Sequence, residues 1–297
     1  MPDTTDTIRL AIGEASAVIA LRGAEPLAWC VGGRDLLWHG DPAFWGFRAP
    51  ILFPVVGASR GGVVRVDGRD YPMAQHGFAR HSGFRPVSQS GDRATLRLVD
   101  DAETRTHYPF GFALDVTASL TADALRLETV VTNTGDVPMP YGIGFHPAFP
   151  WPFAAESTEG HRVLFDAPEG PDLPEVAAGG LLARQTRRVP LDGAALPLAY
   201  DLFSEALVFL AARSRRMRFE APSGAAIALE TENLPHLAIW TKPGAPFLSL
   251  EAWSAHADWA DAVGELGDRA SMTVLEPGAS GLHAITMRFL AAGGQPA

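Results

Sequence analysis

The sequence has few residues of several chemically useful kinds. Cys30 is the single cysteine among 297 residues, which excludes an internal disulfide and a cysteine-based metal site. Lys242 is the only lysine, so arginine supplies nearly all the positive charge of a chain whose net charge is −10. Such an acidic chain is a poor partner for nucleic acid or an anionic membrane. No run approaches the roughly 18 apolar residues of a spanning helix, and the start, MPDTTDTIRL, lacks the pattern of a signal peptide. We therefore expect a soluble cytoplasmic protein.

Two absent motifs concern nucleotide and metal chemistry. The chain contains neither the phosphate-binding loop G-x-x-x-x-G-K-[ST] nor the zinc-binding helix H-E-x-x-H. The pair Gly142-x-Gly144 is followed by His-Pro, which cannot begin the helix of a dinucleotide-binding unit. The histidines also lack the close pair spacing of a typical zinc site. What is present is a set of histidines and a carboxylate among aromatic residues, which suits proton transfer on a polar, uncharged substrate.

Short alternating segments separated by turn residues dominate the chain. Apolar and polar residues alternate over 94–99, 113–120 and 125–131, as in half-buried strands. Asp67-Gly68 is typical of a two-residue hairpin turn. Further strands are expected at 7–12, 17–22, 27–31, 35–38, 63–66, 206–211, 217–221, 225–231, 237–240, 247–253, 271–275 and 282–289, and one short helix at about 256–266. Because no repeat or linker interrupts this pattern, we predict one all-β domain over residues 1–297, a large antiparallel sandwich.

One histidine lies in an unusual setting. His146 stands within YGIGFHPAFPWPF (residues 141–153), among three phenylalanines, a tryptophan and three prolines. The proline that follows favours extended backbone at His146. The aromatic side chains offer flat apolar faces, which suit the CH face of a sugar ring as well as a protein core. His146 is therefore either a histidine held in place for chemistry or a core histidine in a proline-rich loop.

Glu251 is the second candidate. In the expected strand 247–253, alternation places Phe247, Ser249, Glu251 and Trp253 on one face. A carboxylate that shares a face with two aromatic residues is partly desolvated, and desolvation raises its pKa toward values useful for a general base. The alternative is a glutamate paired with one of the many arginines.

Three further residues are candidates for ligand binding. His76 precedes Gly77, and Arg80 lies four residues on, so an imidazole and a guanidinium can present directional donors to a hydroxylated ligand. The alternative is a solvated loop. Asp201 is a weaker candidate, since such a residue is often a turn or capping residue. His39 is left unassigned, and most other histidines are interpreted as surface or rim residues, with His256 at the rim of the same site: His81, His107, His161, His236, His256 and His283.

Six segments resemble one known family over about residues 7–289. They are PILFPVVG (50–57), DG…YPMAQHGFAR (67–80), GFHPAFPWPF (144–153), DLFSEAL (201–207), LAIWTKPGAPFLSLEAW (237–253) and LEPGAS (275–280). Their order resembles that of the aldose 1-epimerase (galactose mutarotase-like) family, and the pairing of HGFAR with GFHPAF is similar to its bacterial branch. The resemblance implies a β-supersandwich of many antiparallel strands with the sugar bound in an open cleft.

The resemblance also implies roles for single residues. His146 matches the family's general acid and Glu251 its general base. His76 matches its sugar-binding histidine, and Asp201 matches an aspartate near the sugar hydroxyls. Two positions depart from the family pattern: the family's E-P-W reads Glu251-Ala252-Trp253, so the turn after the base is expected to differ, and Ala58 stands where an arginine usually follows V-G. The arginine that contacts the substrate stays open among Arg48, Arg60 and Arg80.

The function implied is that of an aldose 1-epimerase, or mutarotase, which interconverts α and β anomers of a hexose without a metal or organic cofactor. The partner is a small-molecule sugar, and the protein is expected to be a monomer or a homodimer. The net charge favours a neutral aldose such as galactose or glucose. One alternative is a hexose-6-phosphate mutarotase with an arginine clamp, for which the candidates are Arg48, Arg60, Arg80 and Arg85. The others are a non-catalytic sugar-binding protein and a polysaccharide lyase or hydrolase, of which hydrolysis would require paired carboxylates.

Overall fold

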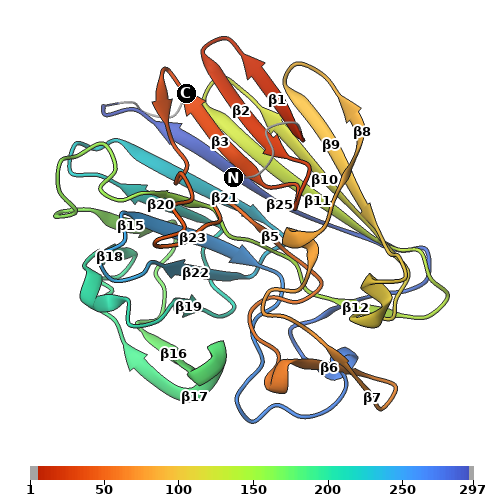
Figure 1. Cartoon of the computed structure of the whole chain (residues 1–297). Coiled ribbons are helices and arrows are strands. Elements are labelled where there is room, and N and C mark those ends of the chain that lie inside the picture. Colours follow the sequence, from red (N-terminus) through yellow and green to blue (C-terminus); the bar gives the residue numbers. More distant parts are fainter. Residues whose placement is uncertain (1–5, 294–297) are drawn as a thin grey trace.

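The computed structural model describes residues 6–293. Its largest sheet is antiparallel throughout and spans the molecule (Figure 1). In spatial order its nine strands are β18 (Ala195–Pro197), β15 (Arg162–Phe165), β20 (Arg216–Glu220), β21 (Ala226–Glu232), β25 (Ser280–Leu290), β11 (Ala124–Asn133), β10 (Phe112–Leu120), β9 (Arg93–Val99) and β8 (Arg85–Gln89). The long strands β11 and β25 lie at its centre, so segments about 150 residues apart pair side by side.

A second antiparallel sheet of six strands carries the segments singled out in the sequence. Its strands are β19 (Leu207–Phe209), β22 (His236–Trp240), β23 (Phe247–Trp253), β13 (Gly144–Phe145) and β5 (Ile51–Leu52), with β14 (Ala148–Pro150) also paired to β23. Because β23 is paired on both sides, this sheet brings residues near positions 52, 146, 208, 238 and 251 together.

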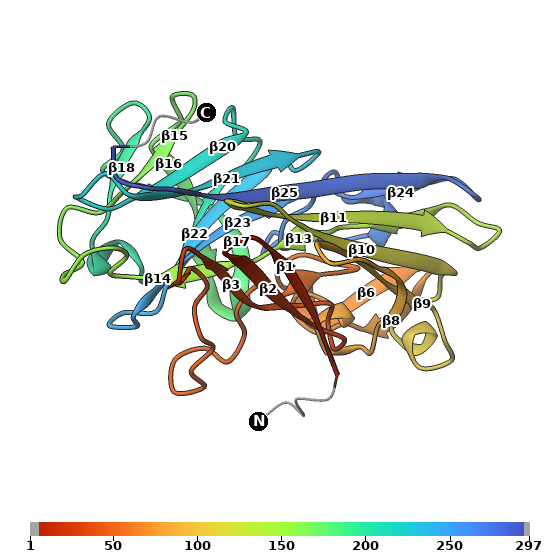
Figure 2. The same cartoon turned by 90° about the horizontal axis from the view of Figure 1, so that it is seen from above.

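Smaller sheets surround these two. Four strands, β1 (Thr7–Ile12), β2 (Ala15–Ala20), β3 (Pro26–Val31) and β4 (Arg34–Asp35), form a sheet whose first two strands contact β10 (Figure 2). Three two-stranded sheets are β6 (Val63–Val66) with β7 (Arg69–Pro72), β12 (Met139–Tyr141) with β24 (Thr273–Leu275), and β16 (Asp172–Ala177) with β17 (Leu181–Arg188). Single 3-10 turns are η1 (Arg60–Gly62), η2 (Ala79–His81), η3 (Thr104–Thr106), η4 (Ala178–Gly180), η5 (Tyr200–Leu202) and η6 (Leu266–Asp268). Within residues 6–293, no helix has the length and apolar character needed to cross a membrane.

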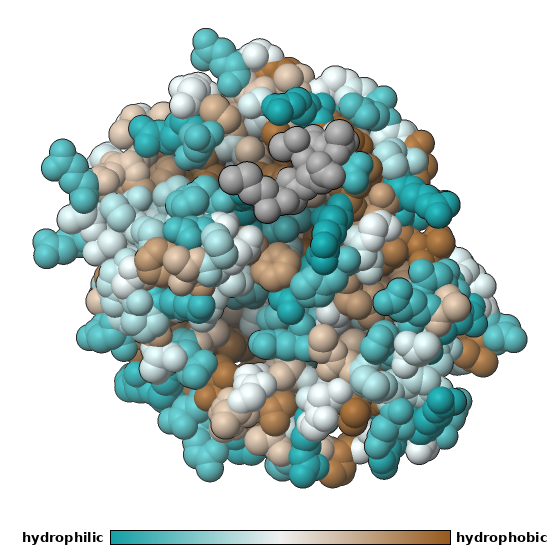
Figure 3. Space-filling model, in the orientation of Figure 1, coloured by the Kyte–Doolittle hydropathy of each residue, from teal (hydrophilic) through white to brown (hydrophobic). Residues whose placement is uncertain are grey.

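The surface seen in the orientation of Figure 1 is mostly hydrophilic (Figure 3). Brown apolar side chains occur there in small, separate patches, and the face is hollowed below its centre. Among residues 6–293, the most exposed large apolar side chain is Val263, at 86%, and most large apolar side chains are buried.

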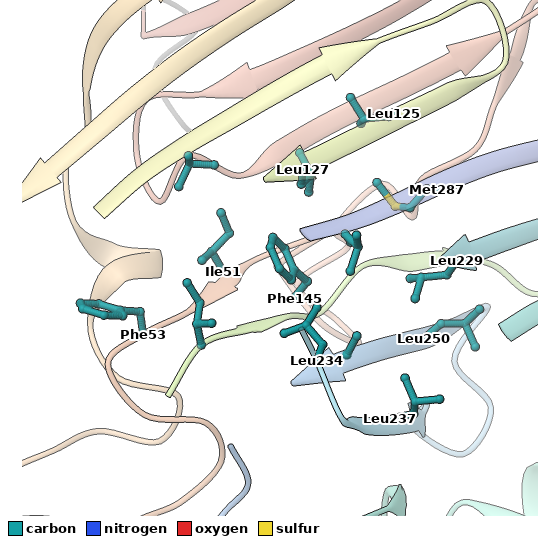
Figure 4. Close-up of a cluster of buried hydrophobic side chains, with 14 of the residues drawn as sticks. Ile51, Phe53, Leu125, Leu127, Phe145, Leu229, Leu234, Leu237, Leu250 and Met287 are labelled. Atoms are coloured by element: carbon teal, nitrogen blue, oxygen red, sulfur yellow. The ribbon is translucent and has the colours of Figure 1, made fainter. Parts of the chain in front are cut away.

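The core lies between the nine-stranded and the six-stranded sheets (Figure 4). Leu127 on β11 and Met287 on β25 face Phe145 on β13 and Leu250 on β23, and all four are at most 1% exposed. Full burial of one such side chain contributes about 1.5–3 kcal/mol. Since Leu250 points into this core, its neighbours on β23 point to the opposite face of the six-stranded sheet.

The prediction of an all-β fold is confirmed, as are the hairpin at Asp67-Gly68, which joins β6 to β7, and the strand 247–253. The predicted helix at 256–266 is wrong. The amide of Asp258 donates to Ala58 O, and the amide of Ala260 donates to Leu182 O on β17, so these amides bond to segments distant in sequence and not to the preceding helical turn. The expectation of a single domain stays a prediction, and its ends, residues 1–5 and 294–297, lie outside the described residues.

Candidate active site

A cavity of about 370 Å³ opens on the outer face of the six-stranded sheet. Its walls include residues of β22 and β23, the β16–β17 hairpin, and the loops around positions 45, 57 and 76. The polar side chains that line it are Gln75, His76, Arg80, His146, Glu205 and Glu251, and the aromatic ones are Trp45, Trp240 and Trp253. The structure therefore brings His76, His146, Arg80 and Glu251 to one cavity.

Strand β23 places Glu251 at the bottom of this cavity. The strand alternates as the sequence predicts, with Leu248 and Leu250 in the main core and Glu251 and Trp253 on the cavity side. Glu251 is only 2% exposed. Its Oε2 accepts a hydrogen bond from Trp253 Nε1 at 3.1 Å, which fixes the carboxylate. The strand continues through Ala252, which pairs with Phe145, so no turn follows Glu251.

His146 comes from the loop that joins β13 to β14. Its amide donates to Pro50 O at 3.2 Å, and Ser249 Oγ lies 2.9 Å from its Nδ1. The other ring nitrogen, Nε2, lies 3.2 Å from Glu251 Oε1. The ring packs against Trp45, with centroids 4.7 Å apart, and meets Trp240 edge-on at 5.7 Å. The imidazole is thus held by two tryptophan rings and by contacts at both nitrogens.

Burial is the largest influence on the charge state of this pair. Burial raises the pKa of Glu251 well above its usual value, although the hydrogen bond from Trp253 opposes this. Burial lowers the pKa of His146 well below its usual value, and the neighbouring His76 and Arg80 lower it further. Burial thus disfavours the charged form of each group, while the distance of 3.2 Å between His146 Nε2 and Glu251 Oε1 allows a proton to pass between them.

His76 occupies a strained backbone position beside the pair. Its φ is +66°, a left-handed conformation that is uncommon for residues other than glycine and clusters at functional sites. Two hydrogen bonds hold it: the His76 amide donates to Gly57 O at 2.8 Å, and the Gly57 amide donates to His76 Nδ1 at 3.0 Å. Because Nδ1 accepts, the neutral ring carries its proton on Nε2. Burial and the nearby Arg80 lower the pKa of His76 to about 3, so the ring is a neutral donor near pH 7.

Gly77 is required next to His76. Its φ is +70°, and a Cβ built there would lie 2.1 Å from Phe53 O. Such a distance is a steric overlap with backbone, so only glycine allows the 74–80 segment to approach β5 this closely. The position of His76 therefore depends on the residue that follows it.

The arginines are separated by the fold. Arg80 lines the cavity, donates from Nη2 to Gln75 O at 2.9 Å, and places its guanidinium 5.0 Å from the ring centroid of Phe47. Arg60 lines a different cavity of about 400 Å³ and donates from Nη1 to Ala262 O at 2.9 Å. Arg48 donates from Nε to His39 O at 2.7 Å and does not line the first cavity. Of the three candidates, only Arg80 is placed to meet a ligand beside His146.

Asp201 lies on the exposed turn η5 and does not line the cavity. Its contact with a sugar stays a prediction, and its position in the structure gives that prediction no support. Glu205, four residues later, lines the cavity instead. Both carboxylates belong to the segment DLFSEAL (201–207). Either carboxylate fits the segment, and only the path of the chain after η5 separates them.

The interpretation of the other histidines as surface or rim residues is wrong for three of them. His161, His236 and His283 are at most 9% exposed. Each ring is hydrogen-bonded to backbone. His161 Nε2 contacts the backbone of Phe153, His236 Nδ1 accepts from the Ala211 amide, and His283 Nδ1 donates to Asn233 O. His256 does not line the cavity either, and its ring meets those of His236 and Trp259 edge-on. Within residues 6–293, no group of three or more His, Cys, Asp and Glu side chains converges in a way that could hold a metal ion.

Comparison with known proteins agrees with this geometry. A family model described as aldose 1-epimerase matches residues 6–287. The chain belongs to the aldose 1-epimerase family. Among curated proteins of this kind, the chromosomal Protein LacX of Lactococcus lactis subsp. lactis is 31% identical over 257 residues, which are 82% of this chain and 86% of that protein.

Solved structures give the same relationship to the aldose 1-epimerase family. A galactose mutarotase-like protein from Lactobacillus casei is 29% identical, with a TM-score of 0.89 over 96% of this chain and 100% of that one. A galactose mutarotase related enzyme from Lactobacillus acidophilus is 26% identical, with a TM-score of 0.88 over 96% of this chain and 98% of that one. The fold is therefore the galactose mutarotase-like fold.

Proposed function

We propose that this protein is an aldose 1-epimerase that interconverts the anomers of a neutral hexose, with Glu251 as general base and His146 as general acid. The observation that carries this proposal is the contact of 3.2 Å between His146 Nε2 and Glu251 Oε1 at the bottom of an open, aromatic-lined cavity. The anomeric hydroxyl and the ring oxygen of a sugar are bonded to the same carbon. An acid and a base this close together can therefore reach both oxygens at once.

Ring opening transfers two protons. The carboxylate of Glu251 takes the proton of the anomeric hydroxyl, while the protonated Nε2 of His146 gives its proton to the ring oxygen. The bond between C1 and the ring oxygen breaks with its electron pair going to that oxygen, and C1 forms a carbonyl with the former hydroxyl oxygen. Rotation about the C1–C2 bond and the reverse transfers then give the opposite anomer. Because Glu251 gains one proton as His146 loses one, the total protonation of the pair is the same before and after each turnover.

The other cavity side chains are assigned to binding. The neutral ring of His76 donates from Nε2, and Arg80 provides charged donors, so both suit sugar hydroxyl oxygens. Glu205 provides acceptors at the mouth of the cavity and replaces Asp201 in this role. The faces of Trp45 and Trp240 suit the CH face of a sugar ring.

The placement of charge favours a neutral sugar over a hexose 6-phosphate. Among residues 6–293, Arg80 is the one arginine that lines the cavity, and Glu205 brings an opposing charge. Arg48, Arg60 and Arg85 do not line it, so the arginine clamp that a phosphate would require is not assembled there. Initial rates with glucose and glucose 6-phosphate test this assignment. A preference of about 100-fold for the phosphate, worth roughly 2.7 kcal/mol, would reverse it.

Glu251→Gln distinguishes an enzyme from a protein that only binds sugar. The amide retains an acceptor for Trp253 Nε1 but removes the base, so kcat should fall by about 10²–10⁴ while sugar still binds. Polarimetry with subtraction of the spontaneous rate measures kcat, and calorimetry measures binding. The matched control is Glu220→Gln, the same change at another buried glutamate, which pairs with Arg162 outside the cavity. Binding of sugar with no rate above the spontaneous one in wild type would leave a sugar-binding protein as the better proposal, and full turnover in Glu251→Gln would show that the base lies elsewhere.

A further inference from the structure

Ser249 is a buried hydroxyl that the mechanism above does not use. It lies two residues before Glu251 on β23, faces the same side of the sheet, and has no exposed surface. Its Oγ lies 2.9 Å from two atoms, His146 Nδ1 and the carbonyl oxygen of Pro147. One hydroxyl thus touches both the catalytic imidazole and the backbone of the residue that follows it.

The donors in this group can be assigned from chemistry alone. A carbonyl oxygen only accepts, so the contact with Pro147 O uses the single hydroxyl proton of Ser249. The contact between Ser249 Oγ and His146 Nδ1 then requires a proton on the nitrogen, which donates to the hydroxyl oxygen. In the neutral ring the lone pair therefore lies on Nε2, the atom that faces Glu251 Oε1 at 3.2 Å.

His76 shows the opposite arrangement in the same cavity. There the Gly57 amide donates to Nδ1, so the neutral ring is protonated on Nε2. The two rings lie with centroids 5.8 Å apart, yet their backbone and hydroxyl partners give them opposite tautomers. His76, which donates from Nε2, therefore lies beside His146, whose Nε2 can take up and release a proton.

We propose that Ser249 is a positioning residue that holds His146 in the Nδ1–H tautomer, so that Nε2 is the atom that exchanges the ring-oxygen proton. The catalytic consequence rests on the proposed function, whereas the tautomer does not. After Nε2 gives its proton to the ring oxygen, the ring is neutral and its lone pair faces that same oxygen, ready to take the proton back. A ring in the other tautomer would have to become an imidazolate in order to donate from Nε2.

Removal of the hydroxyl should reverse the tautomer. In Ser249→Ala the Nδ1–H would lose the hydroxyl oxygen that accepts it in a fully buried place, which is unfavourable. The neutral ring would instead carry its proton on Nε2, the atom that faces Glu251 Oε1. We expect kcat to fall about 10²-fold, because such a ring cannot give up the Nε2 proton without becoming an imidazolate, while KM changes little since the sugar-binding groups are untouched.

Nitrogen NMR of protein labelled with ¹⁵N-histidine tests the tautomer without an activity assay. In wild type, Nδ1 of His146 should show the shift of a protonated nitrogen across the neutral pH range. In Ser249→Ala, Nδ1 should lose its proton and Nε2 should gain it. The matched control is Ser254→Ala, which removes a buried hydroxyl that accepts from the Ile143 amide and should leave the His146 signals unchanged. If Ser249→Ala does not fold, Ser249→Cys, with similar volume and a weak acceptor, takes its place.

The outcomes separate the two proposals. An unprotonated Nδ1 in wild type, or a protonated Nδ1 that persists in Ser249→Ala, would overturn the role of Ser249. If the tautomer shifts as expected but wild type shows no mutarotation, the proposed function fails while the assignment of the tautomer stands. A shift of the tautomer together with a loss of kcat supports both.

Discussion

The pH dependence of stability provides a quantitative test of the environment of His76. Burial and Arg80 lower the pKa of this ring from 6.5 to about 3 in the folded protein. An unfolded chain binds the proton below about pH 6.5, and the folded protein does not until about pH 3, so the unfolded state gains protons first as the pH falls. The free energy of unfolding must therefore decrease across this window.

The size of the effect follows from the shift. Each pKa unit corresponds to about 1.4 kcal/mol, so the shift of His76 removes about 5 kcal/mol between about pH 6.5 and pH 3, of which about 2 kcal/mol is lost by about pH 5. Because the ring lines an open cavity and is reached by water, these values are upper limits.

His76→Asn isolates this contribution. Asparagine tolerates the left-handed backbone at this position and offers an oxygen to the Gly57 amide, but it does not titrate. Urea unfolding of both proteins from about pH 7 to about pH 4 should show wild type losing stability faster than the variant as the pH falls. If the two curves stay parallel over this range, His76 is not buried as a neutral ring, and its assignment as an Nε2 donor is wrong.

Three further predictions concern catalysis and the loop. The double variant of Glu251→Gln with His146→Asn should have a kcat close to that of either single variant, since both residues serve one step, and additive losses would contradict this. In a profile of kcat/KM against pH, the acidic limb should lie above 4.5, the usual pKa of a glutamate, because burial raises the pKa of Glu251, and a limb at or below that value would count against it as the base. Gly77→Ala should lower the free energy of unfolding by more than the roughly 1–3 kcal/mol of backbone strain, because of its overlap with Phe53 O. In the control Gly68→Ala, φ is +74° and the added Cβ meets open space, so the free energy of unfolding should fall only by the cost of the backbone strain. Urea unfolding measures both variants.

Much of the fold could be predicted from the sequence because its strands are local patterns. In β23, alternation alone separates Leu248 and Leu250 from Glu251, and the structure follows it. The segment 256–266 fails for the opposite reason. Its helical pattern is local, but its amides bond to Ala58 and Leu182, which are distant in sequence, and tertiary hydrogen bonds override the local preference.

The candidate site is predictable in part for similar reasons. His146 and Glu251 stand out because their neighbours are unusual, and the fold places their side chains in contact. The exchange of Asp201 for Glu205 at the cavity could not be predicted, since it depends on how the chain leaves η5. The role inferred for Ser249 depends on two distances of 2.9 Å, and no pattern in the sequence encodes those.

The central claim is that the pair of His146 and Glu251 opens and recloses a sugar ring. The most direct measurement is the optical rotation of freshly dissolved α-galactose with increasing amounts of the protein. We expect a first-order rate constant that rises linearly with the concentration of wild-type protein above the spontaneous rate. With Glu251→Gln in place of wild type at the same concentrations, the rate constant should stay close to the spontaneous rate. A rate constant that stays at the spontaneous value with galactose and with glucose at every concentration of wild-type protein would contradict it.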